Sequence, residues 1–447
     1  MKGSGFRFHG SSSASRPAGA GIRFAMAVSL FVTLNPMLAL PAAAQTAPDP
    51  PDSAEPTGPR PLAFRVAKVV SMDDRDSVVN NATVLVKGGR IEAVGPSESV
   101  EVPDGYRVVE MPEAWLVPGL VDAHNHTAGG DFNDMVYLTN PGLNTRAGIE
   151  PGNARIKRAA SGGVTAVLFI PGSGTNISGF GSIVKTAGAN PDEVFMRSPG
   201  SLKIAQAGNP EWYFGGVRRM FMNWNTRQTL LKARAYHRAW EAFEKGETAE
   251  KPEYDPIFDD FRGLFRGEYP LSVHTQWYQV LLTTVEQYHL GMKLWTVLDH
   301  CTFNAWKVGP IVAETDCWTI NGPRQYEFDR TARRMIGNAS GWWKNGVRRL
   351  GINTDAVGFG GIPQHELSFQ AAMACWYGWL PYPALRGVTQ IPAEALGVHD
   401  RIGSIEAGKD ADFGIWTGDP LDPRSACLIT VIDGKIAHDG TKGIRRF

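Results

Sequence analysis

Hydrophobic and polar positions divide this chain into two kinds of segment. Short stretches that alternate or run apolar, separated by turns, fill residues 62–118 and return near the C-terminus at residues 411–416, 429–432 and 436–438. This pattern is typical of β-strands. Each group alone would bury too little apolar surface. We therefore expect residues 62–118 and 402–447 to pair in one composite β-sandwich domain, where the two ends meet.

The middle of the chain alternates buried strands with helical stretches, which indicates an α/β fold. Continuous apolar runs at residues 115–121 and 164–170 are typical of parallel strands covered on both faces. Helical stretches such as residues 279–288 separate later runs. Over roughly 280 residues this rhythm fits a (β/α)8 barrel, which we place at residues 119–401. Residues 211–270, rich in aromatic side chains and Arg, are expected to form an insertion over one mouth of the barrel.

The first 44 residues differ from the rest of the chain. They contain no Asp or Glu, their four Lys and Arg side chains precede an apolar run, and small residues follow that run. This order is typical of a secretory signal peptide, so we expect cleavage near Ala44 and export to the periplasm or the medium. An organelle transit peptide and a cytosolic chain with an overextended start are the alternatives. Residues 45–61 are Pro-rich and indicate an extended linker.

Composition and net charge indicate which kinds of binding partner to expect. The 447 residues are 43% hydrophobic and carry 45 Lys and Arg against 45 Asp and Glu. Without residues 1–44 the balance is 41 to 45, a charge of −4, and we expect no nucleic-acid partner because such proteins carry a basic excess. No later segment approaches the roughly 20 apolar residues of a stable membrane span. The four Cys are too few for a disulfide scaffold and can pair or stay as buried thiols. A homo-oligomer is compatible with these features.

Four His and one Asp follow apolar runs of the predicted barrel. His124 and His126 follow the first run, and because residues two apart on a strand share a face, both imidazoles can bind one metal ion. His274, His300 and Asp355 follow later runs in the same way. Singly, each is explained as a hydrogen-bonded core or loop residue. Together, at the strand ends where barrel active sites lie, they predict a site for a zinc-type ion.

Other motifs are explained without catalysis. Residues 172–181 are rich in Gly and Ser, but no Gly-Lys-Ser or Gly-Lys-Thr follows, so we do not expect a phosphate loop. His365-Glu366 lacks the second His of a zincin helix. Asp299 precedes His300 and by strand alternation should point to the opposite face, so we interpret Asp299 as structural.

The order of these segments resembles the amidohydrolase superfamily, and its exported imidazolonepropionase-like and prolidase-like members most of all. The similar segments are WLVPGLVDAHNH, GGVTAVLFIPGSGTNISG, SVHTQ, VLDHCTF, GINTD and ALRGVTQIPAEALGVHDRIGSIEAGKDADFGIW. They extend over nearly the whole chain after the leader. The resemblance implies a metal-dependent hydrolase with a (β/α)8 barrel and a composite β-sandwich, which is the fold that periodicity predicts.

The resemblance also implies roles for particular residues. The implied metal ligands are His124, His126, Lys203, His274, His300 and Asp355. The two His of the first strand would bind the more buried ion, and the two later His would bind the second. Lys203 lies where many members have a carboxylated lysine that bridges two metals. As an ion-pairing or surface lysine, it would leave a site for one metal.

These ligands imply hydrolysis of a C–N bond in an amide or small peptide-like molecule by a metal-activated hydroxide. One or two divalent ions, zinc before others, would activate the water, and Asp355 would carry its proton to the leaving nitrogen. The alternatives are a mononuclear deaminase or cyclic-amide hydrolase, and a catalytically inactive scaffold of the same fold. Thr275-Gln276 and Ala356 depart from the Ala-His and His of many members, which leaves the substrate open.

Overall fold

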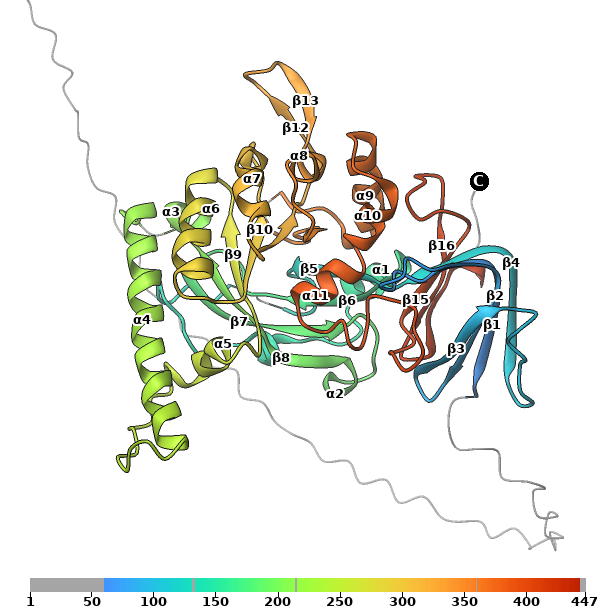
Figure 1. Ribbon diagram of the computed structural model, residues 1–447, viewed down its shortest axis with the longest axis horizontal. Coiled ribbons are helices and arrows are strands. Elements are labelled where there is room, and N and C mark those ends of the chain that lie inside the picture. The colour runs from blue at the N-terminus through green and yellow to red at the C-terminus, as the bar shows by residue number, and fades with distance from the viewer. Residues whose placement is uncertain (1–59, 131–132, 214, 359, 443–447) are drawn as a thin grey trace, which may run out of the picture. The chain divides into compact units, whose positions relative to one another are not determined.

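Two large sheets and the helices around them make up the part of the chain that the structure describes (Figure 1). The structure is a computed structural model, and it describes residues 60–130, 133–213, 215–358 and 360–442. The expected signal peptide and most of the Pro-rich linker lie outside the described residues. None of the described helices is long and apolar enough to cross a bilayer. The four cysteines are free thiols.

Strands from both ends of the described chain form one seven-stranded sheet. In order across the sheet they are β17 (Lys435–Asp439), β16 (Cys427–Ile432), β15 (Phe413–Trp416), β4 (Arg107–Pro118), β1 (Leu62–Val70), β2 (Val78–Lys87) and β3 (Arg90–Pro96). β15 pairs antiparallel with β4, so the N-terminal and C-terminal strands meet as predicted. The rings of Phe64 on β1 and Phe413 on β15 lie 5.1 Å apart in a core that belongs to this sheet. Burying that core requires both groups of strands.

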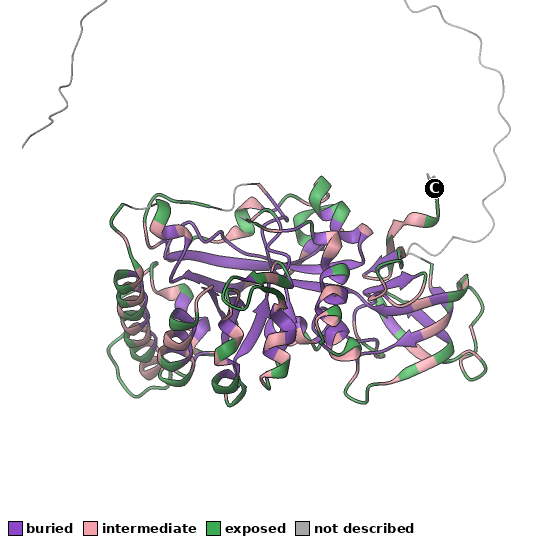
Figure 2. Ribbon diagram, turned by 90° about the horizontal axis from the view of Figure 1, so that it is seen from above, coloured by how far each residue is buried: buried purple, intermediate pink, exposed green. Residues whose placement is uncertain are grey.

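Eight strands form the second sheet, which closes almost completely into a barrel. In order they are β5 (Leu120–Asn125), β6 (Val164–Phe169), β7 (Ile177–Lys185), β8 (Phe195–Ala205), β9 (Leu271–Thr275), β10 (Thr296–His300), β11 (Trp318–Asn321) and β14 (Leu350–Ile352). Backbone hydrogen bonds close the circle: Asp355 N–H donates to the His124 carbonyl at 3.2 Å, and His126 N–H donates to the Ala356 carbonyl at 3.0 Å. Every residue of β5, β6, β9 and β10 is buried, as expected for strands covered on both faces (Figure 2).

One barrel strand departs from the regular (β/α)8 alternation. β7 runs antiparallel to both β6 and β8. Among the described residues, the only helix between β6 and β8 is α2 (Pro191–Val194). Gly and Ser interrupt the apolar residues of β7, so its sequence does not predict a buried strand. The Gly- and Ser-rich residues 172–181 therefore lead directly into the barrel wall.

Gly119 separates the two sheets. The apolar pattern joins residues 115–121 in one run, but β4 ends at Pro118 and β5 begins at Leu120. A Cβ atom at Gly119 would lie 2.0 Å from Oγ1 of Thr165 on β6, so no other residue allows this close approach. The chain therefore passes from the composite sheet into the barrel at a single glycine.

Helices cover the barrel and fill the region after β8. They are α1 (Ala154–Ser161), α3 (Asn209–Tyr213), α4 (Arg219–Glu244), α5 (Arg262–Phe265), α6 (Tyr278–Thr284), α7 (Gly309–Ala313), α8 (Asn338–Lys344), α9 (Leu367–Trp376), α10 (Pro381–Arg386) and α11 (Gln390–Ala395). Short 3-10 helices are η1 (Thr145–Gly148), η2 (Asp259–Phe261), η4 (Ala305–Val308), η5 (Gln364–Glu366) and η6 (Gly440–Lys442), and η3 (Val285–Leu290) is a π-helix that continues α6. β12 (Tyr326–Asp329) pairs with β13 (Arg334–Gly337). α4 lies within residues 211–270 and buries Met222, Leu230 and Ala233 on one face, while its other face is exposed (Figure 2).

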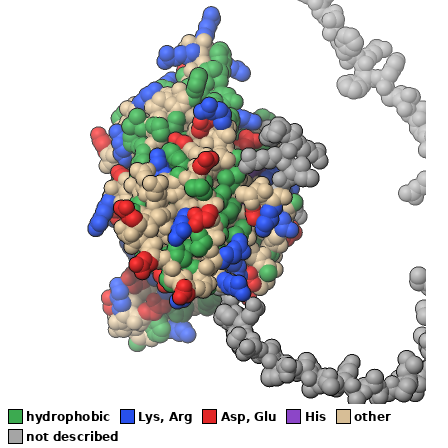
Figure 3. All heavy atoms as spheres, turned by 90° about the vertical axis from the view of Figure 1, so that its right-hand side faces the viewer, with side chains coloured by type: hydrophobic (Ala, Val, Ile, Leu, Met, Phe, Trp, Pro, Cys, Tyr) green, Lys and Arg blue, Asp and Glu red, His purple; other side chains and the backbone are tan. Residues whose placement is uncertain are grey.

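Charged side chains of both signs are mixed on the surface. The face in Figure 3 shows Lys and Arg interspersed with Asp and Glu. Exposed ion pairs such as Arg65–Glu110, with 3.0 Å between nitrogen and oxygen, add little stability because water screens them.

A buried ion cluster joins the two sheets. The Nζ of Lys185, on β7, lies 2.8 Å from a carboxylate oxygen of each of Asp410, Asp412 and Asp433. Burial lowers the pKa of Lys185, but the attraction of the three carboxylates outweighs it and holds the pKa above its usual value. Asp410 and Asp412 precede β15 and Asp433 follows β16, so this lysine ties the barrel to the composite sheet.

We predict that Lys185→Met lowers the free energy of unfolding by about 3 kcal/mol, because it leaves the buried carboxylate of Asp412 without its counter-charge, whereas Asp410 keeps its ion pairs with Arg90 and Arg401. Urea unfolding followed by circular dichroism measures the change. The matched control is Arg65→Met, which removes a cation from an exposed pair and should cost less than about 1 kcal/mol. Equal unfolding free energies for the two variants would contradict the role of the cluster.

Candidate metal centre

The carboxyl ends of the barrel strands bring the six predicted ligands together. His124 and His126 lie at the end of β5, Lys203 near the end of β8, His274 on β9, His300 at the end of β10 and Asp355 just after β14. None of the six is more than 7% exposed. Parallel strands of a barrel end at one rim, so residues far apart in the sequence meet there.

The ligand atoms lie within contact distance of one another. The rings of His124 and His300 are 4.6 Å apart, and those of His274 and His300 are 4.3 Å apart. His124, His300 and Asp355 each offer a ligand atom, and these three atoms lie within 4.8 Å of one another. The Nζ of Lys203 is 3.0 Å from Nε2 of His124. Buried nitrogen and oxygen donors at this spacing suit a divalent ion such as zinc.

His126 and Asp355 face each other in a way that favours a cation between them. Nδ1 of His126 donates to the Ile170 carbonyl at 2.7 Å, since a carbonyl oxygen can only accept. Nε2 of the same ring lies 3.3 Å from Oδ1 of Asp355. A ring nitrogen and a carboxylate oxygen are both common ligand atoms of zinc-type ions.

The backbone at two of these residues is strained. His300 has φ of 67° and Asp355 has φ of 47°, in the left-handed region that non-glycine residues seldom adopt. Strain of this kind collects at functional sites, where it sets the direction of a side chain. Nε2 of His300 is buried and has no hydrogen-bond partner among the described residues. Buried polar atoms usually have a partner, so this nitrogen is a candidate metal ligand.

Burial keeps the imidazoles of His124, His274 and His300 neutral. It lowers the pKa of His274 to about 3 and lowers the pKa values of His124 and His300 well below the usual value, and the charge of Lys203 adds to each decrease. Burial also lowers the pKa of Lys203 itself to about 8. Neutral imidazole is the form of histidine that binds metal, so the surroundings of the centre favour metal binding.

Asp299 faces the centre, and its interpretation as a residue of the opposite strand face was wrong. Its Oδ2 lies 2.9 Å from Nδ1 of His124, and both side chains are fully buried. Strand alternation fails here because the positive φ of His300 turns the chain, so that neighbouring side chains reach the same cluster. Burial raises the pKa of Asp299 to about 8. A carboxyl group beside Nδ1 orients the His124 ring with Nε2 toward the other ligands.

Asp122 holds the two sides of the barrel closure together. Its carboxylate accepts hydrogen bonds from the backbone N–H of Thr354 and from Nε2 of Gln364, each at 3.2 Å. Asp122 therefore links β5 to the segment that carries Asp355. The sequence contains a signal for this residue, because Asp122 lies two positions before His124 and shares its strand face.

A cavity of about 260 Å³ opens onto the centre. Besides four candidate ligands, its lining includes the neutral polar residues Asn133, Ser173, Asn209, Tyr213 and Gln276. Oγ of Ser173 hydrogen-bonds Nδ1 of His274 at 2.8 Å, and no sequence pattern marks this serine as a site residue. Pockets for drug-sized molecules usually measure about 300–1,000 Å³, so this cavity suits a small substrate.

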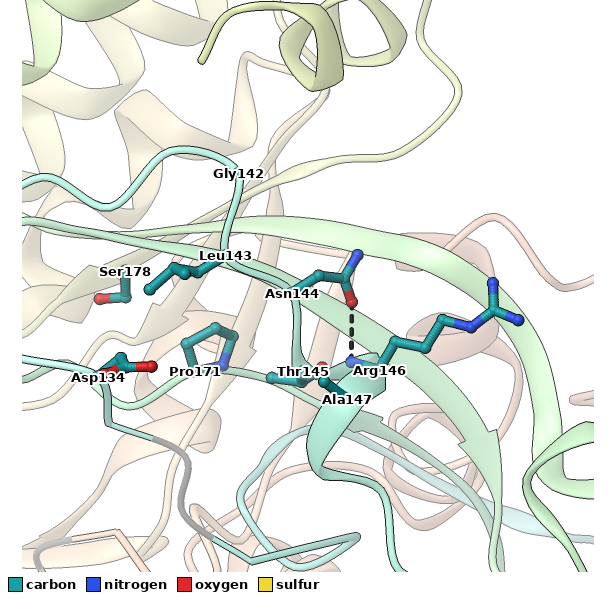
Figure 4. A pocket seen from close by; sticks show the side chains of 9 residues that line it. All are labelled: Asp134, Gly142, Leu143, Asn144, Thr145, Arg146, Ala147, Pro171 and Ser178. Carbon is teal, nitrogen blue, oxygen red and sulfur yellow. Dashed lines mark hydrogen bonds between the residues drawn. The ribbon is translucent and has the colours of Figure 1, made fainter. Parts of the chain in front are cut away.

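A larger cavity of about 610 Å³ lies next to this one, between the loop after β5 and the start of β7 (Figure 4). Asp134 and Pro171 line it, and their chain neighbours Asn133 and Gly172 line the cavity at the centre. Asp134 is the one carboxylate among its lining residues, so this larger cavity offers no comparable set of metal ligands.

Comparisons with known proteins agree with this architecture. A sequence profile described as "Amidohydrolase family" matches residues 287–438. Imidazolonepropionase of Pseudomonas entomophila is 24% identical over 374 residues, which cover 77% of this chain and 89% of that protein. Amidohydrolase tasK of Hapsidospora irregularis is 26% identical over 400 residues, or 80% of this chain, and the chain spans 40% of its length.

A solved structure of an amidohydrolase is also similar to this chain. The crystal structure of an amidohydrolase from Thermotoga maritima superposes with a TM-score of 0.75 at 28% identity, and the match covers 85% of this chain and 100% of the other. The similarity includes the barrel and the sheet built from both chain ends. Fold, sequence profile and relatives together show that the chain belongs to the amidohydrolase superfamily.

Proposed function

We propose that this chain is a metal-dependent hydrolase that cleaves the C–N bond of an amide or small peptide-like molecule. The observation that carries the proposal is the group formed by His124, His300 and Asp355, whose ligand atoms lie within 4.8 Å of one another inside a buried cluster of further donors. Membership in the amidohydrolase superfamily supports hydrolysis as the reaction class.

The proposed ligands can hold one or two divalent ions, with zinc the best match to imidazole and carboxylate. They are His124, His126, His274, His300 and Asp355, joined by Lys203 when its amine is carboxylated. When bound, such an ion lowers the pKa of a coordinated water and polarises a carbonyl oxygen. The buried position of the ligands keeps bulk water away from these atoms.

Residues of the chain itself supply the proton transfer. Asp355 lies at the rim of the barrel and lines the cavity, so its carboxylate can accept a proton from the attacking water. The same carboxyl group then delivers the proton to the leaving nitrogen. Side-chain amides of Asn209 and Gln276 line the cavity and can hydrogen-bond an amide substrate.

The mononuclear alternative is a deaminase or cyclic-amide hydrolase in which Lys203 keeps its unmodified amine. Nζ of that amine lies 3.0 Å from Nε2 of His124, close enough for a hydrogen bond. A carboxylated Lys203 instead presents oxygen atoms as ligands. The number of bound ions therefore separates the two proposals. Export, inferred from residues 1–44, stays a prediction.

We predict that the purified protein binds about two equivalents of zinc per chain and that Lys203→Ala binds about one, because the bridging ligand is lost. Inductively coupled plasma mass spectrometry measures the metal, and circular dichroism checks folding. Lys157→Ala, an exposed lysine on α1, is the control and should match the wild type. One equivalent in both wild type and Lys203→Ala would favour the mononuclear enzyme. A folded wild type that takes up no zinc, manganese or cobalt would contradict both the binuclear and the mononuclear proposal.

We predict that Asp355→Asn lowers kcat by at least about 100-fold, because an amide cannot accept the proton of the water. A panel of N-acylated amino acids and dipeptides supplies the assay. Asp134→Asn makes the same change at an exposed carboxylate that lines the larger cavity, and it should keep the wild-type rate. Near-normal turnover by Asp355→Asn would remove Asp355 as the base.

A further inference from the structure

Exposed apolar side chains gather on the segments that follow the carboxyl ends of the barrel strands. Met220 is 86% exposed and Trp212 is 84% exposed, and both follow β8. Single exposed apolar residues are ordinary, but a contiguous group of them marks an interaction site. We call this group the rim surface, and it consists of Trp212, Met220, Trp224, Phe303, Phe328 and Met335.

The rim surface borders the opening of the metal centre. Tyr213 of α3 lines the cavity at the centre, and Trp212 directly precedes it. Gln276 lines the same cavity after β9, and Trp277 directly follows it. Whatever covers the rim surface therefore lies beside the route to the proposed metal ligands.

Contacts between side chains connect the parts of the rim surface. The guanidinium of Arg219, next to Met220 at the start of α4, lies 4.2 Å from the centre of the Trp277 ring. Trp277 stacks on Phe303 with 5.6 Å between ring centroids. The backbone N–H of Phe303 donates to the carboxylate of Glu327 on β12 at 3.2 Å. The apolar side chains of α4, of the loop after β10 and of the β12–β13 hairpin therefore belong to one surface.

The hairpin of β12 and β13 projects from the barrel (Figure 1). Phe328 pairs with Met335 in its register, so these two side chains share a face, and both are exposed. Glu327 lies on the opposite face, where it accepts hydrogen bonds from the loop that follows His300. A two-stranded hairpin is only marginally stable in water, and exposed apolar side chains on it favour association. The outer face of the hairpin is therefore suited to a partner.

The rim surface also carries an excess of positive charge. Residues 209–227 and 322–337 contain seven Arg, no Lys and three Asp or Glu. Each of the three carboxylates already has an ion pair or backbone N–H groups as partners. Arg330, Arg333 and Arg334 are exposed at the end of the hairpin, and none forms an ion pair between described residues. Figure 3 shows Lys and Arg side chains at the end of this projection.

We propose that the rim surface docks on an anionic lipid membrane, with the opening of the metal centre toward the bilayer. Aromatic and Met side chains enter the region between headgroups and acyl chains, and arginines bind the phosphates of the headgroups. A second copy of this chain is a poorer partner, because a symmetric contact would bring the same arginines face to face. This inference does not depend on the proposed hydrolytic function.

Sedimentation of the purified protein with lipid vesicles tests the role of charge. Vesicles of equal parts phosphatidylcholine and phosphatidylglycerol should bind the wild type at least about tenfold more tightly than vesicles of phosphatidylcholine alone. Arg333→Gln/Arg334→Gln should weaken binding to the anionic vesicles at least about tenfold. The control, Lys87→Gln/Arg107→Gln, removes the same charge from exposed positions of the composite sheet and should bind as the wild type does. Residues 1–44 are the same in every variant.

A second pair of variants tests the apolar side chains. Phe328→Ser/Met335→Ser should also weaken binding to the anionic vesicles at least about tenfold, because less apolar surface leaves water on docking. Val78→Ser/Val108→Ser replaces exposed apolar side chains of the composite sheet and should keep the wild-type affinity. Circular dichroism checks that each variant is folded.

Two results would overturn the proposal. One is equal affinity of the wild type and both rim variants for the anionic vesicles. The other is a wild type that leaves the vesicles unbound and forms a dimer in analytical ultracentrifugation, with Phe328→Ser/Met335→Ser monomeric. That second result would assign the rim surface to another copy of the chain.

Discussion

Closure of the barrel between β5 and the segment after β14 is the constraint on which the site depends. Two backbone hydrogen bonds make it, from Asp355 to His124 and from His126 to Ala356. They place an aspartate from the end of the barrel beside two histidines from its first strand. Asp122 strengthens the same seam through side-chain hydrogen bonds. The backbone bonds that close the barrel therefore involve three of the candidate ligands and Ala356, which directly follows one of them.

Two clusters of buried polar side chains differ in how their charges and lone pairs are compensated. Around Lys185 three carboxylates are balanced by Lys185 and by Arg90 and Arg401, which pair with Asp410, so the cluster is complete within the chain and holds the two sheets together. At the rim, buried imidazole nitrogens and carboxyl oxygens face one another, and some of them lack a hydrogen-bond partner among the described residues. Burying a polar group without a partner is unfavourable. A metal ion bound to these atoms would therefore stabilise the folded state as well as supply chemistry.

The turn at Val357 and Gly358 divides two chemical environments. On one side lie the proposed metal ligands and neutral hydrogen-bonding groups. On the other lie two arginines of α1, Arg155 and Arg158, among largely apolar or neutral residues. Val357 itself has φ of 74°, a strained value for a β-branched residue.

The sequence by itself determined the barrel, the meeting of the chain ends and the positions of the candidate ligands. Strand periodicity and the common rim of parallel strands are local or general rules, and they place residues such as His124 and His274 without knowledge of contacts. Tertiary structure decided the direction of β7, the contact of Asp299 with His124 and the convergence of α1 with the turn after Asp355. These features depend on non-local packing and on single backbone angles, such as the positive φ of His300, which no periodic pattern records.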